Sequence, residues 1–462
     1  MPGTVPETDT IVAISTPPGR GGIGIVRLSG PEAKAVGEQL VRLRQPLDHA
    51  RVRLADVLDD RPAEEGGARI DEAVVTFFAG PNSYTAEDLV EIAAHGAPVV
   101  LEWLLRRAID LGARLAEPGE FTQRAFLAGR LDLTQAEAVR DLIEAQTLTQ
   151  ARQAASQMGG ALSRRVAPIK QSLVELIAVL EAGIDFAEDD VEVTPGTEIA
   201  RRIVEVTEPL RALDSSFARG RIVHDGLTLA IVGRPNAGKS SLFNRLVERD
   251  RAIVTATPGT TRDLVTERIS LDGIPLELVD TAGLRETAEE VEQLGIARSR
   301  EALADAALVL VVLDATQPVN EEERRLLSAV EDRPAVIAIN KSDLVTDGSA
   351  DLPNGIEAKY PALHTSALTG EGIAVLRERI LELATGGAAS EPGMLTNMRH
   401  HGAVVTALDG LDAAARANAS GIPHEMILID LYRSLWALDS LTGQTTPDDV
   451  LNLIFSTFCI GK

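Results

Sequence analysis

One segment, Gly233 to Ser240, limits the possible folds of this chain more than any other feature. It matches the pattern G-x-x-x-x-G-K-[ST], follows the apolar run Leu227–Val232 and opens a segment with helical spacing. This combination is typical of a P-loop, which joins a buried strand to a helix and wraps a phosphate group. Its glycines let backbone N–H groups point at phosphate oxygens, while Lys239 adds a positive charge there and Ser240 offers a hydroxyl to Mg²⁺. The segment therefore predicts a nucleotide-binding α/β domain.

The pattern of strand, loop and helix repeats after the P-loop as far as about residue 385. Three later runs have the composition of buried parallel strands: Leu308–Asp314, Ala335–Ile339 and Ala362–Thr365. The runs Val265–Leu271 and Ile274–Val279 flank Asp272-Gly273, which is a strong signal for a two-residue hairpin. Residues 222–385 are therefore expected to form a doubly wound α/β domain.

Three motifs at strand ends predict which nucleotide this domain binds. Asp280-Thr281-Ala282-Gly283 supplies a carboxylate for Mg²⁺, through water, and a glycine N–H for the γ-phosphate. In Asn340-Lys341-Ser342-Asp343 the aspartate can accept two hydrogen bonds from guanine, a pair that adenine does not offer. Ser366-Ala367-Leu368 fits the loop whose backbone N–H reads guanine O6. With the P-loop, these motifs predict GTP, and Thr261 is expected to add a second hydroxyl to Mg²⁺.

One position departs from Ras-type enzymes, which orient the attacking water with a glutamine directly after the D-x-x-G glycine. This chain has Leu284 there, and a leucine cannot position water. Either hydrolysis is very slow and the chain is a GTP-gated scaffold, or another group orients the water. The nearby candidates are Glu286, Glu289, Glu290 and Glu292, and their spacing alone does not choose among them.

The rest of the chain divides around this domain. Residues 1–120 are expected to be α/β, with strands at Thr10–Ser15, Gly24–Leu28, Arg51–Leu58 and Glu72–Phe78 and helices at Pro31–Leu43 and Ala97–Asp110. Residues 121–221 have helical spacing that predicts two or three long helices, with a break from Asp185 to Gly196. Residues 386–462 return to helical spacing. The GTPase domain is therefore expected to be inserted into a helical domain.

The overall charge restricts the partners of the chain. Its formal net charge of −24 opposes direct attraction to nucleic acid or to an anionic membrane. The single cysteine, Cys459, fits a reducing compartment, and the sequence shows neither a signal peptide nor a transmembrane run. We therefore expect a cytoplasmic protein with no membrane contact, which reaches RNA only through a local basic patch or a basic partner.

Five further segments carry a resemblance that covers nearly the whole chain. They are Pro17-Pro18-Gly19-Arg20-Gly21-Gly22, Gly80-Pro81-Asn82-Ser83-Tyr84-Thr85, Pro118-Gly119-Glu120-Phe121, Leu131-Asp132-Leu133-Thr134-Gln135-Ala136-Glu137-Ala138 and Phe458-Cys459-Ile460-Gly461-Lys462. Together with the inserted GTPase domain they resemble the MnmE (TrmE) family of tRNA-modifying enzymes, of the TrmE-Era-EngA-like GTPase class. The resemblance implies an N-terminal α/β folate-binding and dimerisation domain over residues 1–120.

The resemblance also implies a function and its partners. Such proteins are K⁺-stimulated GTPases that form homodimers and act with a flavin-dependent partner, MnmG (GidA), in a heterotetrameric or larger complex. The pair adds an aminomethyl or carboxymethylaminomethyl group at C5 of the wobble uridine of tRNA, and 5-formyltetrahydrofolate or a related folate carries the one-carbon unit. The two GTPase domains associate when GTP and K⁺ are bound.

Several site residues follow from the resemblance, residue by residue. Glu292 matches the glutamate that orients the attacking water, and K⁺ is expected at Asn236, Thr255, Thr257 and Thr260, where K⁺ takes the electrostatic place of an arginine finger. Pro258 stands where the family more often has a small apolar residue, and it stiffens this loop. Arg27, Glu91, Arg130 and Lys462 match the folate positions, although Arg130 replaces a lysine of some members.

The expected nucleotide site can now be given in full. Mg²⁺ is expected at Ser240 and Thr261. The expected GTP-binding residues are Asn236, Ala237, Gly238, Lys239, Ser240, Ser241, Thr255, Ala256, Thr257, Pro258, Gly259, Thr260, Thr261, Asp280, Thr281, Ala282, Gly283, Asn340, Lys341, Ser342, Asp343, Ser366, Ala367 and Leu368.

Two weaker signals and one alternative function complete the interpretation. Gly19-x-Gly21-x-x-Gly24 matches a dinucleotide-binding pattern, but a strand-like run follows it where that pattern requires a helix. Cys459 is interpreted as a small apolar residue of a docked tail rather than as a nucleophile. The alternative within enzymes is a ribosome-assembly GTPase, which usually carries a basic RNA-binding domain that is not apparent in this sequence.

Overall fold

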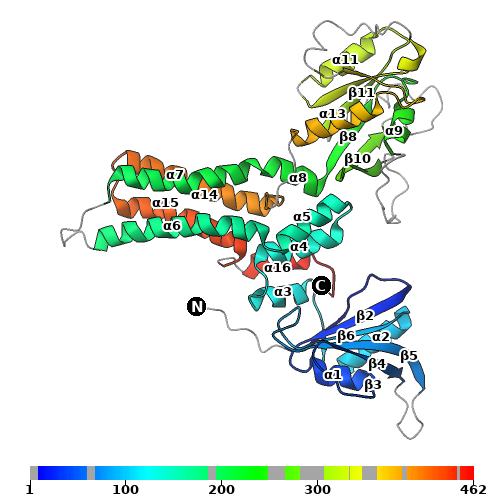
Figure 1. Cartoon of the computed structure of the whole chain (residues 1–462), viewed down its shortest axis with the longest axis vertical. Coiled ribbons are helices and arrows are strands. Elements are labelled where there is room, and N and C mark those ends of the chain that lie inside the picture. Colours follow the sequence, from blue (N-terminus) through cyan, green and yellow to red (C-terminus); the bar gives the residue numbers. More distant parts are fainter. Residues whose placement is uncertain are drawn as a thin grey trace. The chain divides into compact units, whose positions relative to one another are not determined.

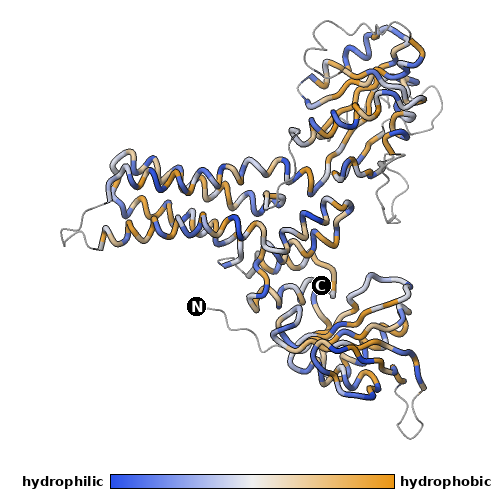
Figure 2. The backbone as a smooth tube through the Cα atoms, in the orientation of Figure 1, coloured by the Kyte–Doolittle hydropathy of each residue, from blue (hydrophilic) through white to orange (hydrophobic). Residues whose placement is uncertain are grey.

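The computed structural model describes residues 9–59, 68–185, 194–247, 266–280, 306–331, 333–345, 360, 362–387, 393–444 and 448–461. The chain forms two compact units (Figure 1): Met1–Arg140 together with Asp439–Lys462, and Asp141–Leu438. In Figure 2 the hydrophobic residues concentrate on the strands and on one side of the helices, as expected where each layer buries one face. No helix within these ranges is long and apolar enough to cross a membrane.

The first unit is built on a seven-stranded sheet in the order β3-β4-β5-β6-β2-β1-β7. Its strands are β1 (Ile11–Ile14), β2 (Gly21–Ser29), β3 (Arg42–Leu43), β4 (Arg51–Leu58), β5 (Arg69–Phe78), β6 (Leu89–Gly96) and β7 (Arg114–Leu115). Neighbouring strands are antiparallel, except that β1 and β7 are parallel. The strand β2 confirms that the glycine pattern at residues 19–24 opens a strand and not the helix of a dinucleotide site.

Helices α1 (Ala33–Leu40) and α2 (Pro98–Asp110) cover one face of this sheet. The core beneath them is formed by alternate strand residues, among them Val26, Val75 and Ile92. The intervening residues point to the opposite face, where Val52, Leu54 and Val74 are exposed.

The end of the chain packs within the same unit as its beginning. Helix α16 (Asp448–Ser456) contacts α3 (Glu120–Leu127), and its Phe455 packs with Phe126 and with Leu133 of α4 (Leu133–Glu144). The tail then continues along residues 118–119, where the N–H of Gly119 donates to the carbonyl of Cys459 at 3.4 Å. The Cys459 side chain itself is exposed.

The second unit contains a helical part and the predicted α/β domain. Its helices are α5 (Leu148–Met158), α6 (Ala161–Asp185), α7 (Gly196–Ser215), α8 (Phe217–Asp225), α14 (Met398–Ala419) and α15 (His424–Thr442). Helix α7 packs along both α6 and α14 and runs antiparallel to each of them (Figure 1). Of the two or three long helices expected over residues 121–221, the described residues show two, α6 and α7, accompanied by the shorter helices α3, α4, α5 and α8, which were not predicted separately. Thr147 begins α5 through a capping box with Gln150, and Gly159 ends it.

The α/β domain lies between α8 and α14 in the sequence. Its six-stranded sheet has the order β13-β12-β11-β8-β10-β9, parallel except for the β9–β10 hairpin. The strands are β8 (Leu227–Val232), β9 (Thr266–Leu271), β10 (Ile274–Asp280), β11 (Leu308–Asp314), β12 (Ala335–Asn340) and β13 (Ala362–His364). Helices α9 (Lys239–Val247) and α13 (Ile373–Thr385) cover one face, and α11 (Glu321–Ala329) covers the other. The doubly wound fold is therefore confirmed.

Candidate functional site

The P-loop (residues 233–240) joins β8 to α9 and requires glycine at two positions. Gly233 and Gly238 have φ angles of +151° and +94°, which other residues rarely adopt. A Cβ atom on Gly233 would lie 2.3 Å from the carbonyl oxygen of Val312, and one on Gly238 would lie 2.2 Å from Nδ2 of Asn340. The two glycines thus let the loop lie directly against the ends of β11 and β12.

The P-loop lysine is held inside its own loop. Lys239 is 8% exposed, and its Nζ donates to the carbonyl oxygens of Gly233 at 2.7 Å and Arg234 at 2.8 Å. Asn236 has a φ of +63°, a left-handed conformation that turns the loop between its glycines. An ammonium enclosed by a loop that ends at a helix N-terminus provides the charge and the donors that a phosphate group needs.

Asn340 joins the P-loop to the loop after β13. Its Nδ2 donates to the carbonyl of Ala237 at 3.0 Å, and its Oδ1 accepts from the N–H of Ala367 at 3.0 Å. The Asn340 residue is 1% exposed, so both halves of its amide are satisfied inside the protein. Three of the four predicted nucleotide motifs therefore meet at the carboxyl ends of parallel strands, where ligands bind in this type of fold.

A buried charged cluster lies behind this junction. Lys341, with a φ of +65°, donates from Nζ to Oδ2 of Asp314 at 2.7 Å. The guanidinium of Arg234 lies 3.7 Å from the same oxygen and 3.3 Å from Oε1 of Glu323. Burial alone would raise the pKa of Asp314, but hydrogen bonds from Lys341 and Thr316 outweigh it and lower this pKa. The cluster fixes a P-loop residue to the Asn340–Asp343 motif.

Sequence reasoning missed Arg234 and Asp314 as members of this cluster. Asp314 was recognisable as a charged residue that ends an apolar strand beside the site, whereas Arg234 stands at an unrestricted position of its motif. Asp343 is exposed in the 3-10 helix Ser342–Leu344, so its carboxylate is open to a bound base.

Part of the predicted site lies outside the described residues. This applies to the predicted residues from Thr255 to Thr261, to Thr281, Ala282 and Gly283, to Glu292 and to Lys462. The backbone of Asp280 is described and pairs with Ile231 of β8, which brings the D-x-x-G motif to the same sheet edge as the P-loop. Within the described ranges, His, Cys, Asp and Glu form no group of three that could hold a metal. Ser240, the predicted Mg²⁺ ligand of the P-loop, lies in the first turn of α9.

The predicted folate residues Arg27 and Glu91 meet on the sheet of the first unit. They are paired across β2 and β6, and the Nε and Nη2 atoms of Arg27 lie 2.9 and 2.7 Å from Oε1 of Glu91. The Arg27 Nη1 donates to the carbonyl of Gly461 at 3.3 Å, and Ser15 Oγ donates to it at 3.1 Å. The tail that precedes Lys462 therefore ends beside this ion pair.

Aromatic rings enclose the same arginine. Arg27 lies 5.8 Å from the ring centroid of Tyr84 and 5.7 Å from that of Phe121. The guanidinium of Arg130 lies 5.5 Å from the Tyr84 ring, and its Nη1 donates to the Tyr84 carbonyl at 2.6 Å. Burial raises the pKa of Tyr84, whose hydroxyl is 2.8 Å from Oγ1 of Thr122. Tyr84 and Phe121 were missed as site residues, although both stand in the family-like segments. Cationic groups beside aromatic faces suit a flat ligand with a carboxylate.

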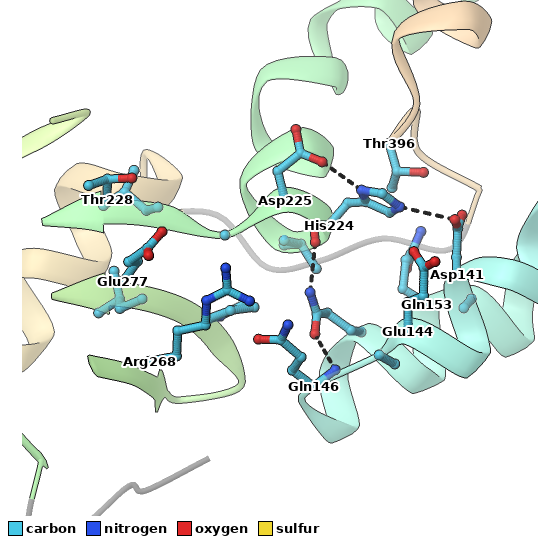
Figure 3. A pocket seen from close by; sticks show the side chains of 18 of the residues that line it. Asp141, Glu144, Gln146, Gln153, His224, Asp225, Thr228, Arg268, Glu277 and Thr396 are labelled. Carbon is cyan, nitrogen blue, oxygen red and sulfur yellow. Dashed lines mark hydrogen bonds and ion pairs between the residues drawn. The ribbon is translucent and has the colours of Figure 1, made fainter. Parts of the chain in front are cut away.

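A separate cavity of about 350 Å³ lies in the second unit, lined by polar side chains from α4, α5, α8 and the β9–β10 hairpin (Figure 3). His224 stands at its wall, with Nδ1 2.7 Å from Asp225 and Nε2 3.3 Å from Asp141. Gln150 Nε2 donates to the His224 carbonyl at 2.7 Å, and Thr147 Oγ1 donates to the carbonyl of Gly273 at 2.6 Å. The cavity is separate from the P-loop. The hydrogen bonds from Gln150 and Thr147 hold α8 and the hairpin turn to the helical part.

His224 provides a pH test of these contacts. The hydrogen bond to Asp141 outweighs burial and, with Asp225, raises the pKa of His224 from 6.5 to about 9. Because the pKa of His224 is higher in the folded chain than in the unfolded chain, protonated His224 stabilises the fold. This contribution is complete below pH 6.5 and disappears as the pH rises through about 9. After discounting the shift for partial exposure, we expect His224→Gln to cost about 2 kcal/mol at pH 6 and almost nothing at pH 9.5. Urea denaturation at both pH values measures the difference; an equal cost at both would contradict the ion pairs.

Comparisons with known proteins place the chain in a family. Residues 133–459 match the family model described as MnmE helical domain, and residues 10–130 match the model described as GTP-binding protein TrmE N-terminus. A protein of Koribacter versatilis named tRNA modification GTPase MnmE is 59% identical over 98% of this chain and 99% of its own length. Proteins of the same name from Moorella thermoacetica and Acetivibrio thermocellus are 42% and 40% identical over at least 98% of both chains.

Two solved structures each match part of this chain. The G domain of the Thermotoga maritima FeoB iron transporter is 29% identical and covers 34% of this chain and 98% of its own, with a TM-score of 0.25. Aquifex aeolicus Era bound to GDP and AlF4⁻ is 24% identical and covers 40% of this chain and 66% of its own, with a TM-score of 0.28. The family models and the full-length relatives decide the assignment: this chain belongs to the MnmE (TrmE) family of tRNA modification GTPases.

Proposed function

We propose that this chain is a K⁺-stimulated GTP hydrolase that drives the modification of wobble uridine in tRNA. The observation that carries the proposal is the junction at Asn340, which joins the phosphate-binding loop and the predicted guanine loop in a chain of the MnmE family. GTP binds with its phosphates in the P-loop, near Lys239, and its base between Asp343 and the loop 366–368. Mg²⁺, held by Ser240 and Thr261, offsets charge on the phosphate oxygens.

The K⁺ requirement and the role of Glu292 come from the resemblance to the MnmE family. Leu284 cannot orient water, and the resemblance gives that role to Glu292. It places K⁺ at Asn236, Thr255, Thr257 and Thr260, where the ion supplies the charge of an arginine finger. The left-handed conformation of Asn236 supports this assignment, because it turns the residue at the outer bend of the P-loop, where its side chain is exposed. The second candidate, a GTP-gated scaffold with negligible turnover, is favoured only by Leu284.

The first unit binds 5-formyltetrahydrofolate or a related folate. Arg27, Arg130 and Lys462 attract a carboxylate, and Glu91 accepts hydrogen bonds from a ring. Because Glu91 receives two bonds from Arg27, this arginine also fixes the direction of its carboxylate. Arg27→Lys is expected to weaken binding of 5-formyltetrahydrofolate about tenfold. A lysine ammonium lacks the planar guanidinium whose two N–H groups orient Glu91.

Calorimetric titration of the full chain measures this affinity. Arg106→Lys is the matched control, because Arg106 lies on α2 with 78% of its side chain exposed and pairs with Glu102 at 3.5 Å. Unchanged folate binding in Arg27→Lys, or equal losses in both variants, would contradict the assignment.

The chain acts as a homodimer with MnmG (GidA), a flavoprotein, in a heterotetrameric or larger complex in the cytoplasm. The open sheet face of the first unit supports self-association, because Val52, Leu54 and Val74 are 62%, 57% and 41% exposed there. The net charge of −24 makes the partner the expected carrier of most tRNA contacts.

The direct test is a reconstitution. The full chain, the flavoprotein, GTP, Mg²⁺, KCl, the folate donor, ammonium or glycine as the amine donor, and unmodified tRNA are combined, and the wobble nucleoside is analysed by mass spectrometry. Aminomethyl or carboxymethylaminomethyl uridine is expected only when this chain and GTP are both present. Unmodified uridine in the complete mixture, with a flavoprotein that is active with another family member, would refute the proposal.

A further inference from the structure

Arg245 connects the helix that follows the P-loop to the predicted guanine loop, Ser366 to Leu368. It stands in the last turn of α9. Its Nε donates to the carbonyl oxygen of Ala367 at 2.9 Å, and its Nη2 donates to that of Leu368 at 2.7 Å. One planar guanidinium therefore holds two successive peptide groups in a fixed orientation.

Fixing these carbonyls also fixes the direction of one N–H group. The carbonyl of Ala367 and the N–H of Leu368 belong to the same planar, trans peptide group, so they point in opposite directions. When Arg245 holds the carbonyl on one side, the N–H is presented on the other. The direction of this donor is therefore determined by a side chain from a different element.

The other N–H groups of the loop are already engaged. The N–H groups of Ser366 and Gly370 bond to backbone carbonyls, that of Ala367 bonds to Asn340 and that of Thr369 bonds to Ser366 Oγ. Within the described part of the chain, no acceptor is found for the N–H of Leu368, whose side chain is 77% exposed. This N–H is thus the donor that the loop can offer to a ligand.

We propose that Arg245 is a positioning residue for guanine recognition, which orients the Leu368 N–H toward the exocyclic O6 of the base. The inference rests on the proposed role of the loop 366–368. Through its two hydrogen bonds, Arg245 also connects the loop 366–368 to α9, whose first turn contains Lys239 and Ser240. Asn340 and Arg245 hold the loop from two sides, through its N–H at Ala367 and through its carbonyls.

Nucleotide analogues separate this role from a general structural one. GDP is compared with 6-thio-GDP, whose sulfur at position 6 is a poor acceptor, and with IDP, which keeps O6 but lacks the 2-amino group that Asp343 is expected to bind. Dissociation constants are measured by equilibrium titration of the full chain. Wild type is expected to bind 6-thio-GDP and IDP each at least about tenfold more weakly than GDP.

Arg245→Gln is expected to weaken GDP binding about tenfold and to bring the ratio of the 6-thio-GDP and GDP dissociation constants close to one. The ratio for IDP and GDP should stay as in wild type, because Asp343 is untouched. Arg245→Lys, which keeps the charge without the planar fork, should also lower the first ratio and provides the test if Arg245→Gln does not fold. Arg379→Gln, on the exposed side of α13, is the control and should change neither ratio.

If both Arg245 variants keep the wild-type ratios, whether all three nucleotides bind equally more weakly or as before, the inference is overturned. A different result would contradict the proposed guanine site itself. If wild type binds GDP tightly but does not distinguish 6-thio-GDP from it, the loop 366–368 does not read O6, whatever Arg245 does. The two failures are therefore distinguishable in one set of titrations.

Discussion

Asp343→Asn is expected to lower the affinity for GTP about a thousandfold and to create affinity for xanthosine triphosphate. The carboxylate of Asp343 accepts from N1–H and from the 2-amino group of guanine. An asparagine amide keeps one acceptor but turns its N–H₂ toward that amino group, so two donors face each other. Xanthine has a carbonyl at this position and restores the pair. Titration with both triphosphates measures the exchange.

Glu382→Gln is a suitable control for this exchange, because its carboxylate is exposed on α13 and pairs with Arg379. It should bind GTP as wild type does. If Asp343→Asn instead loses all nucleotides equally, or keeps its preference for GTP, the base is not read at Asp343. Asp343 is exposed in the 3-10 helix that follows β12, so its replacement should change nucleotide selectivity without unfolding the domain.

Glu292→Ala is expected to lower the rate of GTP hydrolysis about a hundredfold and to leave the affinity for GTP nearly unchanged. The reason is that a residue which orients water acts in the transition state and not in binding. Single-turnover hydrolysis and nucleotide titration, both in KCl, separate the two quantities. Glu292 lies outside the described residues, so this prediction depends on the family resemblance alone.

Glu289→Ala and Glu290→Ala are the matched controls, because these glutamates are close in sequence and equally acidic. Both should hydrolyse GTP at nearly the wild-type rate. A hundredfold loss in one of them, with a normal rate for Glu292→Ala, would move the water-orienting role to that residue. A loss of GTP affinity in Glu292→Ala would make it a structural residue.

The elements that the sequence predicted well are those with local signals. A few consecutive residues are enough to predict the conformation of these elements: the P-loop glycines, the Asp272-Gly273 turn and the apolar runs of β8, β11 and β12. The strand β6 was not predicted, because Leu89–Gly96 mixes alanine, glutamate and histidine without a clean alternation. It becomes a strand through its pairing with β5 and β2, which a single sequence does not reveal.

The same limit applies to the sites. The motifs identified Asp343 and Lys239 because each fits a short pattern with a physical purpose. The pairing of Arg27 with Glu91 depends on the register between β2 and β6, and the contact of Arg245 with Ala367 depends on how α9 packs beside the sheet. Such partners stand far apart in sequence and carry no local signal, so only the folded chain brings them together.

The proposed role of K⁺ distinguishes this GTPase from Ras-type enzymes, which use other groups in its place. GTP turnover by the full chain should therefore be measured in KCl and in NaCl at equal ionic strength and saturating GTP. The rate should be at least about tenfold higher in KCl, because K⁺ at Asn236 and its neighbours offsets charge that develops during phosphoryl transfer. Equal and very slow rates in the two salts would contradict this role and favour a GTP-gated scaffold.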